Sequence, residues 1–251
     1  MHTRPTDIAT WLANAVSAAG AEGLVVPLDG RLGSALTARL CQMAMEEKTV
    51  AVVAGDGPLS TAANDAQIIA ETLQMRLLRL PLELACNRLT AALGGTMAGS
   101  GAPPVTADRE WARAAGLRQR ILMADIYFIA DSLNYLVAGF LDRTDLTIGT
   151  FTRHGDAAVD LLPLGQLLKS DVLAMASELQ VPPAIIERAQ AAPLSIPDTS
   201  YASITGLTNA DLERYLANGP DGVAPAVALR IERLMRASER RGAAPLTMVI
   251  E

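Results

Sequence analysis

One turn near the N-terminus combines residue types that suit anion chemistry. Residues 24–26 form an apolar run that predicts a buried strand, and Ser34 opens a helix-period pattern through Leu36, Leu40 and Met43. A strand, a tight turn and a helix together direct backbone N–H groups and the positive end of a helix dipole at one place. The turn itself, residues 29–34 (DGRLGS), adds a carboxylate and a guanidinium. The backbone layout is therefore that of an anion site, but the residues of the turn fit its usual occupant, a phosphate, poorly.

The elements that must position this turn alternate along the chain. We expect strands at 24–26, 49–54, 76–80 and 135–139, and helices at 7–19, 34–47, 62–73 and 111–133. Strands separated by helices of this length predict a twisted parallel α/β sheet with helices on both faces. Residues 94–104 are rich in Gly, Ala and Pro and predict a mobile loop, and the part after Pro163 is predicted to be mostly helical. Without repeats or a second core, residues 1–251 are expected to form a single domain.

Composition narrows the class of function. The net charge of −6 and the absence of a basic stripe with aromatic residues argue against a nucleic-acid partner. No apolar run approaches the roughly 20 residues of a membrane span, so we expect no membrane association. The N-terminus lacks a signal-peptide pattern, which predicts a cytoplasmic protein. The two cysteines, Cys41 and Cys86, lack metal-type spacing and are interpreted as buried thiols.

The second half of the chain resembles a known family. Residues 149–187 are similar to the segment of ammonia-dependent NAD synthetases that reads G-Y-F-T-K-Y-G-D, then D-x-x-P-x-x-x-L-x-K, then V-P-x-x-I-I. Residues 120–127 resemble that family's Q-A-R-x-R-M helix, and residues 140–146 (FLDRTDL) resemble its T-G-N-R-S-E-L strand end. Residues 64–66 fall where the family has an acidic-Ala pair at the start of a helix.

The resemblance implies a fold, a reaction and partners. The fold would be of the adenine nucleotide α-hydrolase type, Rossmann-like with a helical C-terminal part, in a homodimer. ATP would adenylylate the carboxylate of deamido-NAD with release of pyrophosphate, and ammonia would then attack the mixed anhydride. Magnesium would bridge the phosphates to acidic side chains. The cofactors implied are thus ATP and Mg²⁺ if the protein is active, and none otherwise.

Carried over residue by residue, the resemblance assigns a set of site residues. Lys169, one of two lysines in the chain, would be the catalytic cation that neutralises phosphate charge, unless it is a plain surface lysine. The ATP and pyrophosphate site would comprise Gly30, Arg31, Ser34, Lys169 and, in the loop at 195–201, Thr199. The dinucleotide site would comprise Arg120, Tyr127, Arg153, His154 and Asp156, and the metal ligand would be Asp145. A lone histidine such as His154 also fits a purely structural role.

The sequence departs from the family pattern at the residues that would carry the chemistry. Against the family loop S-G-G-x-D-S, Asp29 replaces Ser, Arg31 replaces Gly and Gly33 replaces Asp. A carboxylate about 4 Å from a phosphate charge costs on the order of 4 kcal/mol at an effective dielectric near 20, more than the roughly 0.3–1 kcal/mol that a helix dipole returns. Arg31 either pairs with Asp29 and fills the turn or holds phosphate through its planar fork.

Other departures lie nearby. Asp145 replaces a Glu of the family and is shorter by one methylene, which weakens a magnesium site that demands near-ideal distances. Phe140, Leu141 and Asp142 replace T-G-N, and Leu122 replaces an arginine. Phe140 and Leu141 also suit an ordinary core.

Two classes of function stay open. In the first, the protein is an ATP-dependent amide ligase that acts on deamido-NAD or on a different carboxylate. In the second, it is a catalytically silent relative that binds a dinucleotide or serves as a regulatory or partner subunit. It would pair with itself or with a paralogue whose loop is intact. Fold alone does not separate these alternatives.

Overall fold

A four-stranded parallel sheet forms the centre of the molecule. The structure is a computed structural model that describes residues 3–55, 61–101, 106–191 and 207–242. The strands are β1 (Gly23–Pro27), β2 (Thr49–Ala54), β3 (Arg76–Leu80) and β4 (Tyr135–Val137), in the order β3-β2-β1-β4. All neighbouring pairs are parallel, with Leu24 opposite Thr49 and Gly23 opposite Tyr135. The predicted parallel sheet is confirmed, although β4 ends at Val137, two residues earlier than expected.

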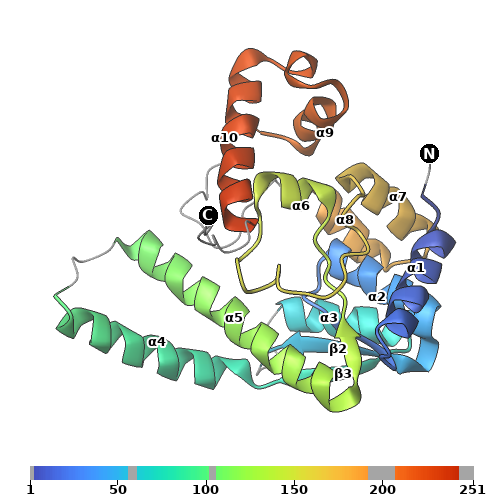
Figure 1. Ribbon diagram of the computed structural model, residues 1–251, viewed down its shortest axis with the longest axis horizontal. Coiled ribbons are helices and arrows are strands. Elements are labelled where there is room, and N and C mark those ends of the chain that lie inside the picture. The colour runs from blue at the N-terminus through green and yellow to red at the C-terminus, as the bar shows by residue number, and fades with distance from the viewer. Residues whose placement is uncertain (1–2, 56–60, 102–105, 192–206, 243–251) are drawn as a thin grey trace, which may run out of the picture.

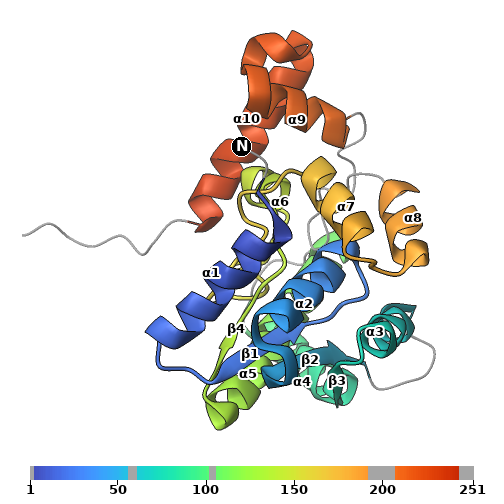
Figure 2. The ribbon, with the colours of Figure 1, turned by 90° about the vertical axis from the view of Figure 1, so that its right-hand side faces the viewer.

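Helices cover both faces of this sheet (Figures 1 and 2). One face packs against α1 (Pro5–Ala18), α2 (Leu32–Met45), α3 (Thr61–Thr72), α7 (Lys169–Glu178) and α8 (Pro183–Ala191). The other face packs against α5 (Ala107–Leu133). In β1, Leu24 and Val26 belong to the first core and Val25 to the second, and all three are fully buried. A strand apolar on both sides is what a sheet covered on both faces requires.

The helical hairpin of α4 (Leu82–Gly99) and α5 projects from the sheet (Figure 1). The loop predicted at 94–104 is wrong for its first part, because α4 continues to Gly99. Gly94, Gly95 and Gly99 each cost the helix about 1 kcal/mol relative to Ala. The helix is anchored near its start, where Leu82 and Cys86 are buried and Glu83 pairs with Arg118 at 2.5 Å, whereas residues 91–100 are all exposed. Residues 102–105 lie outside the described part of the chain.

The C-terminal part is helical, as predicted. It comprises α6 (Arg143–Ile148), α9 (Asn209–Asn218) and α10 (Pro225–Gly242), with a short 3-10 turn at Pro220–Gly222. A second 3-10 turn, Glu46–Lys48, joins α2 to β2. α6, α9 and α10 share a small core of their own, made of Ile148, Leu207, Leu212, Ile231 and Leu234. Among the described residues, no helix is long and apolar enough to cross a membrane.

Candidate nucleotide-binding site

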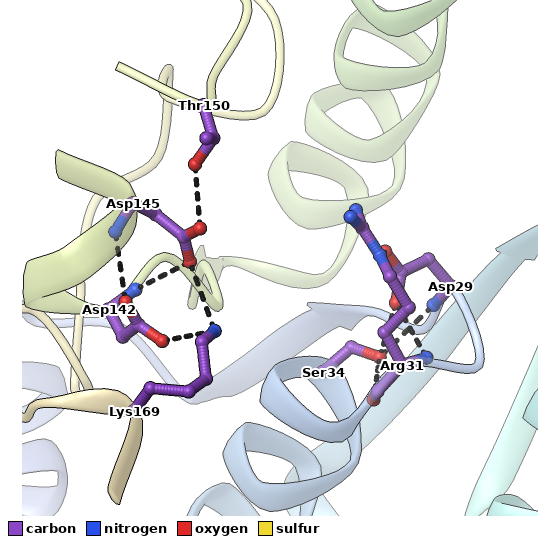
Figure 3. Close-up of polar contacts among 7 residues, drawn as sticks. All are labelled: Asp29, Arg31, Ser34, Asp142, Asp145, Thr150 and Lys169. Atoms are coloured by element: carbon purple, nitrogen blue, oxygen red, sulfur yellow. Dashed lines mark hydrogen bonds and ion pairs between the residues drawn. The ribbon is translucent and has the colours of Figure 1, made fainter. Parts of the chain in front are cut away.

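The turn between β1 and α2 is organised around the carboxylate of Asp29. Its Oδ1 accepts hydrogen bonds from the Ser34 hydroxyl at 2.6 Å and from the Arg31 backbone N–H at 3.0 Å. Its Oδ2 pairs with Arg31 Nε at 2.5 Å. Ser34 is fully buried and also accepts from the Asp29 N–H at 3.3 Å. The turn therefore folds its own side chains over the start of α2 (Figure 3).

The Asp29–Arg31 pair keeps both partners charged. Burial acts to raise the pKa of Asp29, but the Arg31 charge and the hydrogen bonds from Ser34 and Arg31 outweigh it and lower the pKa below its ordinary value. Asp29 is also the main cause of the raised pKa of Arg31. The guanidinium carbon of Arg31 lies 5.6 Å from the centre of the Phe140 ring. This pairing is the one that the filled-turn interpretation predicts.

Two glycines allow close backbone approach around the turn. Gly30 has φ +80°, and a Cβ there would lie 2.7 Å from the Cβ of Asp65 and 2.8 Å from the Ala62 carbonyl oxygen. A Cβ at Gly33 would lie 2.9 Å from the carbonyl oxygen of Phe140. The family's aspartate would therefore not fit at position 33 unless the segment after β4, which contains Phe140, moved. Gly33 is required by the packing as it stands.

A second polar group faces the turn across a gap (Figure 3) and comprises Asp142, Asp145, Thr150 and Lys169. Asp142 caps α6: its Oδ1 accepts from the Asp145 N–H at 2.9 Å, and Asp145 Oδ2 accepts from the Asp142 N–H at 3.2 Å. The Thr150 hydroxyl donates to Asp145 Oδ1 at 2.6 Å. Lys169 Nζ lies 2.5 Å from Asp142 Oδ2 and 3.8 Å from Asp145 Oδ2. The Lys169 ammonium is thus the counter-ion of both the Asp142 and the Asp145 carboxylates.

Burial and charge act in opposite directions in this group. Burial acts to lower the pKa of Lys169, but Asp145 and Asp142 outweigh it and raise the pKa above its ordinary value. Burial and the charge of Asp145 raise the pKa of Asp142 despite the neighbouring ammonium. Lys169 is therefore a cation at neutral pH, and it is far from the plain surface lysine of the alternative interpretation because only 26% of its side chain is exposed.

A cavity of about 380 Å³ lies between the two polar groups at the carboxyl end of the sheet. It brings together four of the predicted site residues, namely Gly30, Arg31, Asp145 and Lys169, and Ser34 lies buried beside it. Thr199 lies outside the described residues. Among those described, no group of three or more His, Cys, Asp or Glu side chains is arranged to hold a metal ion on its own.

The cavity also contains residues that sequence reasoning missed. Arg188 of α8 pairs with Asp65 of α3 at 2.7 Å, and both line the cavity together with Asn209 at the start of α9. The resemblance at 64–66 pointed to Asp65, but nothing in the sequence linked it to Arg188. With these residues, three cations (Arg31, Lys169, Arg188) lie among the carboxylates of Asp29, Asp65, Asp142 and Asp145.

Of the predicted dinucleotide residues, Asp156 lines a cavity, whereas Arg120, Tyr127, Arg153 and His154 line neither of the two cavities. A smaller cavity of about 170 Å³ shares Asp29 and Phe140 with the first and is lined by Asp156 and by Leu122 of α5. Arg120 Nε donates to the carbonyl of Arg153 at 3.1 Å, which ties α5 to the segment after α6. In that segment Asp156 accepts from the Thr152 N–H at 2.7 Å.

Tyr127 and His154 line neither cavity. The Tyr127 hydroxyl donates to Asp160 at 3.1 Å, and Asp160 also accepts from the Val137 N–H at 2.7 Å, so this tyrosine supports the end of β4. His154 is exposed and has φ +60°.

A parallel sheet with an anion-type turn after β1, and a cation-lined cavity at its carboxyl end, is typical of nucleotide-binding α/β proteins. The chain belongs to the NAD synthase family, whose sequence model matches residues 5–236. The resemblance found in the sequence is thereby confirmed.

Individual relatives match over nearly the full length. The chain is 33% identical over 238 residues to the NH3-dependent NAD(+) synthetase of Carboxydothermus hydrogenoformans, covering 95% of this chain and 93% of the relative. It is 31% identical to the corresponding enzyme of Mycoplasma pneumoniae, covering 96% and 92%. In fold it is similar to the NMN synthetase of Francisella tularensis, with a TM-score of 0.82 and 23% identity over 98% and 97% of the two chains.

Proposed function

We propose that this protein is an ATP-dependent amide ligase that amidates deamido-NAD, or a related carboxylate, with ammonia. The observation that carries the proposal is the cavity between the α2 and α7 N-termini, where Arg31, Lys169 and Arg188 converge. Three cations in one cavity beside a helix N-terminus suit a polyphosphate. The membership of this chain in the NAD synthase family supports ATP as that polyphosphate.

The reaction would proceed in two balanced steps. A carboxylate oxygen of the substrate attacks the α-phosphorus of ATP, and pyrophosphate leaves with the bonding electrons of the broken P–O bond. The nitrogen of ammonia then attacks the activated carbonyl carbon, loses a proton, and AMP leaves with the former carboxylate oxygen. Lys169 and Arg31 would stabilise the negative charge that develops on the departing phosphates.

The donor set around Asp145 fits a magnesium ion. Mg²⁺ is usually held by one or two carboxylates together with substrate phosphates, and Asp145 presents one carboxylate to the cavity. When bound, the ion would supply charge neutralisation at the phosphates. Arg120, Tyr127, Arg153, His154 and Asp156 stay the proposed dinucleotide residues. Of these, Asp156 has the strongest support because it lines the second cavity.

The ligase proposal is tested by pyrophosphate release from ATP–magnesium with ammonia and deamido-NAD. We expect release in the wild type and a loss of roughly 100-fold or more in kcat/KM for Lys169→Met, since the main phosphate cation is removed. Lys48→Met is the matched control, because Lys48 lies in an exposed 3-10 turn outside both cavities. Wild type that releases no pyrophosphate with deamido-NAD, or with its mononucleotide counterpart, would contradict the proposal.

A second candidate function is a catalytically silent dinucleotide-binding or partner subunit. The observation that favours it is the Asp29 carboxylate, which occupies the turn with Ser34 and Arg31 and repels phosphate. Calorimetric titration separates the two candidates. Binding of NAD or deamido-NAD without binding of ATP–magnesium supports the silent subunit, whereas micromolar ATP binding supports the ligase.

We also propose that the protein is a cytoplasmic homodimer. In α4, Leu89, Leu93 and Met97 follow one another at four-residue spacing and are 45, 49 and 44% exposed. Residues spaced in this way share one helix face, and exposed apolar patches mark interaction sites. A heteromer with a paralogue that has an intact loop would use the same face.

A further inference from the structure

The residue that caps α6, Asp142, carries a negative charge that helix capping does not require. Asp142 is the N-cap residue, only 1% exposed, and its Oδ1 already satisfies the Asp145 N–H. Asparagine caps helices about as well as aspartate does, so capping alone does not explain a carboxylate here. The remaining oxygen, Oδ2, points to Lys169 Nζ at 2.5 Å (Figure 3).

Both partners of this ion pair are fixed by the backbone. Asp142 is held by the reciprocal hydrogen bonds with Asp145. Lys169 is the first residue of α7, and the segment just before it is tied to α6 by the Arg143 N–H, which donates to the Leu167 carbonyl at 2.9 Å. The ion pair is therefore set before any ligand arrives.

A phosphate that approaches Lys169 must compete with Asp142. Drawing the ammonium away would leave the Asp142 carboxylate buried and unpaired, which is costly, and would place it next to a further negative charge. Asp145, whose Oδ2 lies 3.8 Å from the same ammonium, adds to that repulsion. A divalent cation that arrives with the phosphate would relieve both carboxylates.

We propose that Asp142 is a positioning residue that acts as an internal counter-ion for Lys169 and makes binding of polyphosphate at this cavity depend on a divalent cation. The inference rests on the proposed phosphate role of Lys169. It deepens that role by assigning the regulation of the site to a residue that does not itself touch the ligand.

The first test is calorimetric titration with inorganic pyrophosphate, with and without magnesium. We expect Asp142→Asn to bind magnesium-free pyrophosphate about tenfold or more tightly than wild type, and the difference to shrink when magnesium is present. Asp171→Asn is the matched control, because Asp171 also accepts a hydrogen bond in a capping box, from the Leu168 N–H at 3.0 Å, and lines neither cavity. Equal affinities in wild type and Asp142→Asn, including no binding in either, would overturn the inference.

A second test follows the lysine directly. Lys48 and Lys169 are the two lysines of the chain, so selective isotope labelling gives two side-chain NMR signals, and Lys48 is an internal reference. We expect Asp142→Asn to shift the Lys169 signal and pyrophosphate to shift it further, with Lys48 unchanged. A Lys169 signal that stays unshifted by the Asp142→Asn substitution, or by added pyrophosphate, would contradict the inference.

These tests separate the inference from the ligase proposal. If wild type releases pyrophosphate from ATP but Asp142→Asn binds pyrophosphate no more tightly, the inference fails and the ligase proposal stands. If Asp142→Asn binds pyrophosphate more tightly but neither protein forms an amide, the ligase proposal fails and the inference stands.

Discussion

Asp29 has the largest influence on what the turn after β1 can bind. Its side chain is 28% exposed and bonded to both Arg31 and Ser34, so it occupies the place where a phosphate would meet the start of α2. Arg31 offsets part of this charge, but its pairing with Asp29 also takes up the guanidinium Nε. The balance between these two residues decides how tightly the turn holds an anion.

Removing the Asp29 carboxylate should strengthen ATP binding. We expect Asp29→Ser to tighten ATP–magnesium binding by roughly tenfold, because repulsion on the order of 4 kcal/mol at 4 Å is reduced by solvent screening at this partly exposed site. Calorimetry measures the effect. Asp7→Ser is the control, since it breaks the exposed Arg4–Asp7 pair on α1. Weaker ATP binding in Asp29→Ser would mean instead that Asp29 orients Arg31 toward phosphate.

The lowered pKa of Asp29 predicts a pH dependence of stability. A carboxyl whose folded pKa lies below the unfolded value of about 3.9 stabilises the protein above that value and loses the contribution as the pH falls through the folded pKa. Asp29→Asn should therefore lose less unfolding free energy than wild type between neutral pH and about pH 3. Urea unfolding at the two pH values measures this, and equal losses would contradict it.

Sequence reasoning located single residues better than it located pairs. The resemblance and the turn composition brought Gly30, Arg31, Asp145 and Lys169 to one cavity. The Asp142–Lys169 and Asp65–Arg188 pairs were not predicted, because each joins elements far apart in the chain through tertiary packing. The sequence alone shows that Gly33 departs from the family pattern. Only the distance to the Phe140 carbonyl oxygen shows that there is no room for a side chain at this position.

At the scale of elements, the contact between the β1–α2 turn and α3 sets the shape of the cavity. Gly30 is in the left-handed region and touches the first turns of α3. We expect Gly30→Ala to destabilise the protein by about 2–4 kcal/mol, from backbone strain plus overpacking. Gly20→Ala is the control: Gly20 has φ +65° but nothing within 4 Å, so it should cost only about 1 kcal/mol. Similar losses in urea unfolding would show that Asp65 moves aside freely.

Element prediction succeeded where the pattern was strong. β2 and β3 have the expected bounds: β2 is an apolar run that ends before Gly55, and β3 ends before Pro81, and glycine and proline are strong breaks in a strand pattern. α5 begins at Ala107 rather than 111 because Thr106 caps it, accepting from the Arg109 N–H at 3.4 Å. The end of α4 was predicted as a loop because Gly94, Gly95 and Gly99 disfavour a helix, yet α4 continues to Gly99 although residues 91–100 are exposed.

At the scale of the whole molecule, the α4–α5 hairpin presents apolar side chains that the described part of the chain leaves exposed, including Trp111 (60%) and Phe128 (75%). We expect the double change Leu93→Glu with Met97→Glu to convert a dimer to a monomer, since buried charges in an apolar interface are costly. Light scattering after size-exclusion chromatography measures the mass. Leu229→Glu, at a 64% exposed site on α10, is the control. A monomeric wild type would contradict the homodimer.

The most direct test of the ligase proposal follows one oxygen atom. Deamido-NAD labelled with ¹⁸O in its carboxylate is incubated with the protein, ATP, magnesium and ammonia, and the AMP is examined by mass spectrometry. Attack of the carboxylate on the α-phosphorus predicts AMP that carries one labelled oxygen, in equal amount to the amide. Amide formed with unlabelled AMP, or no AMP at all, would contradict the account.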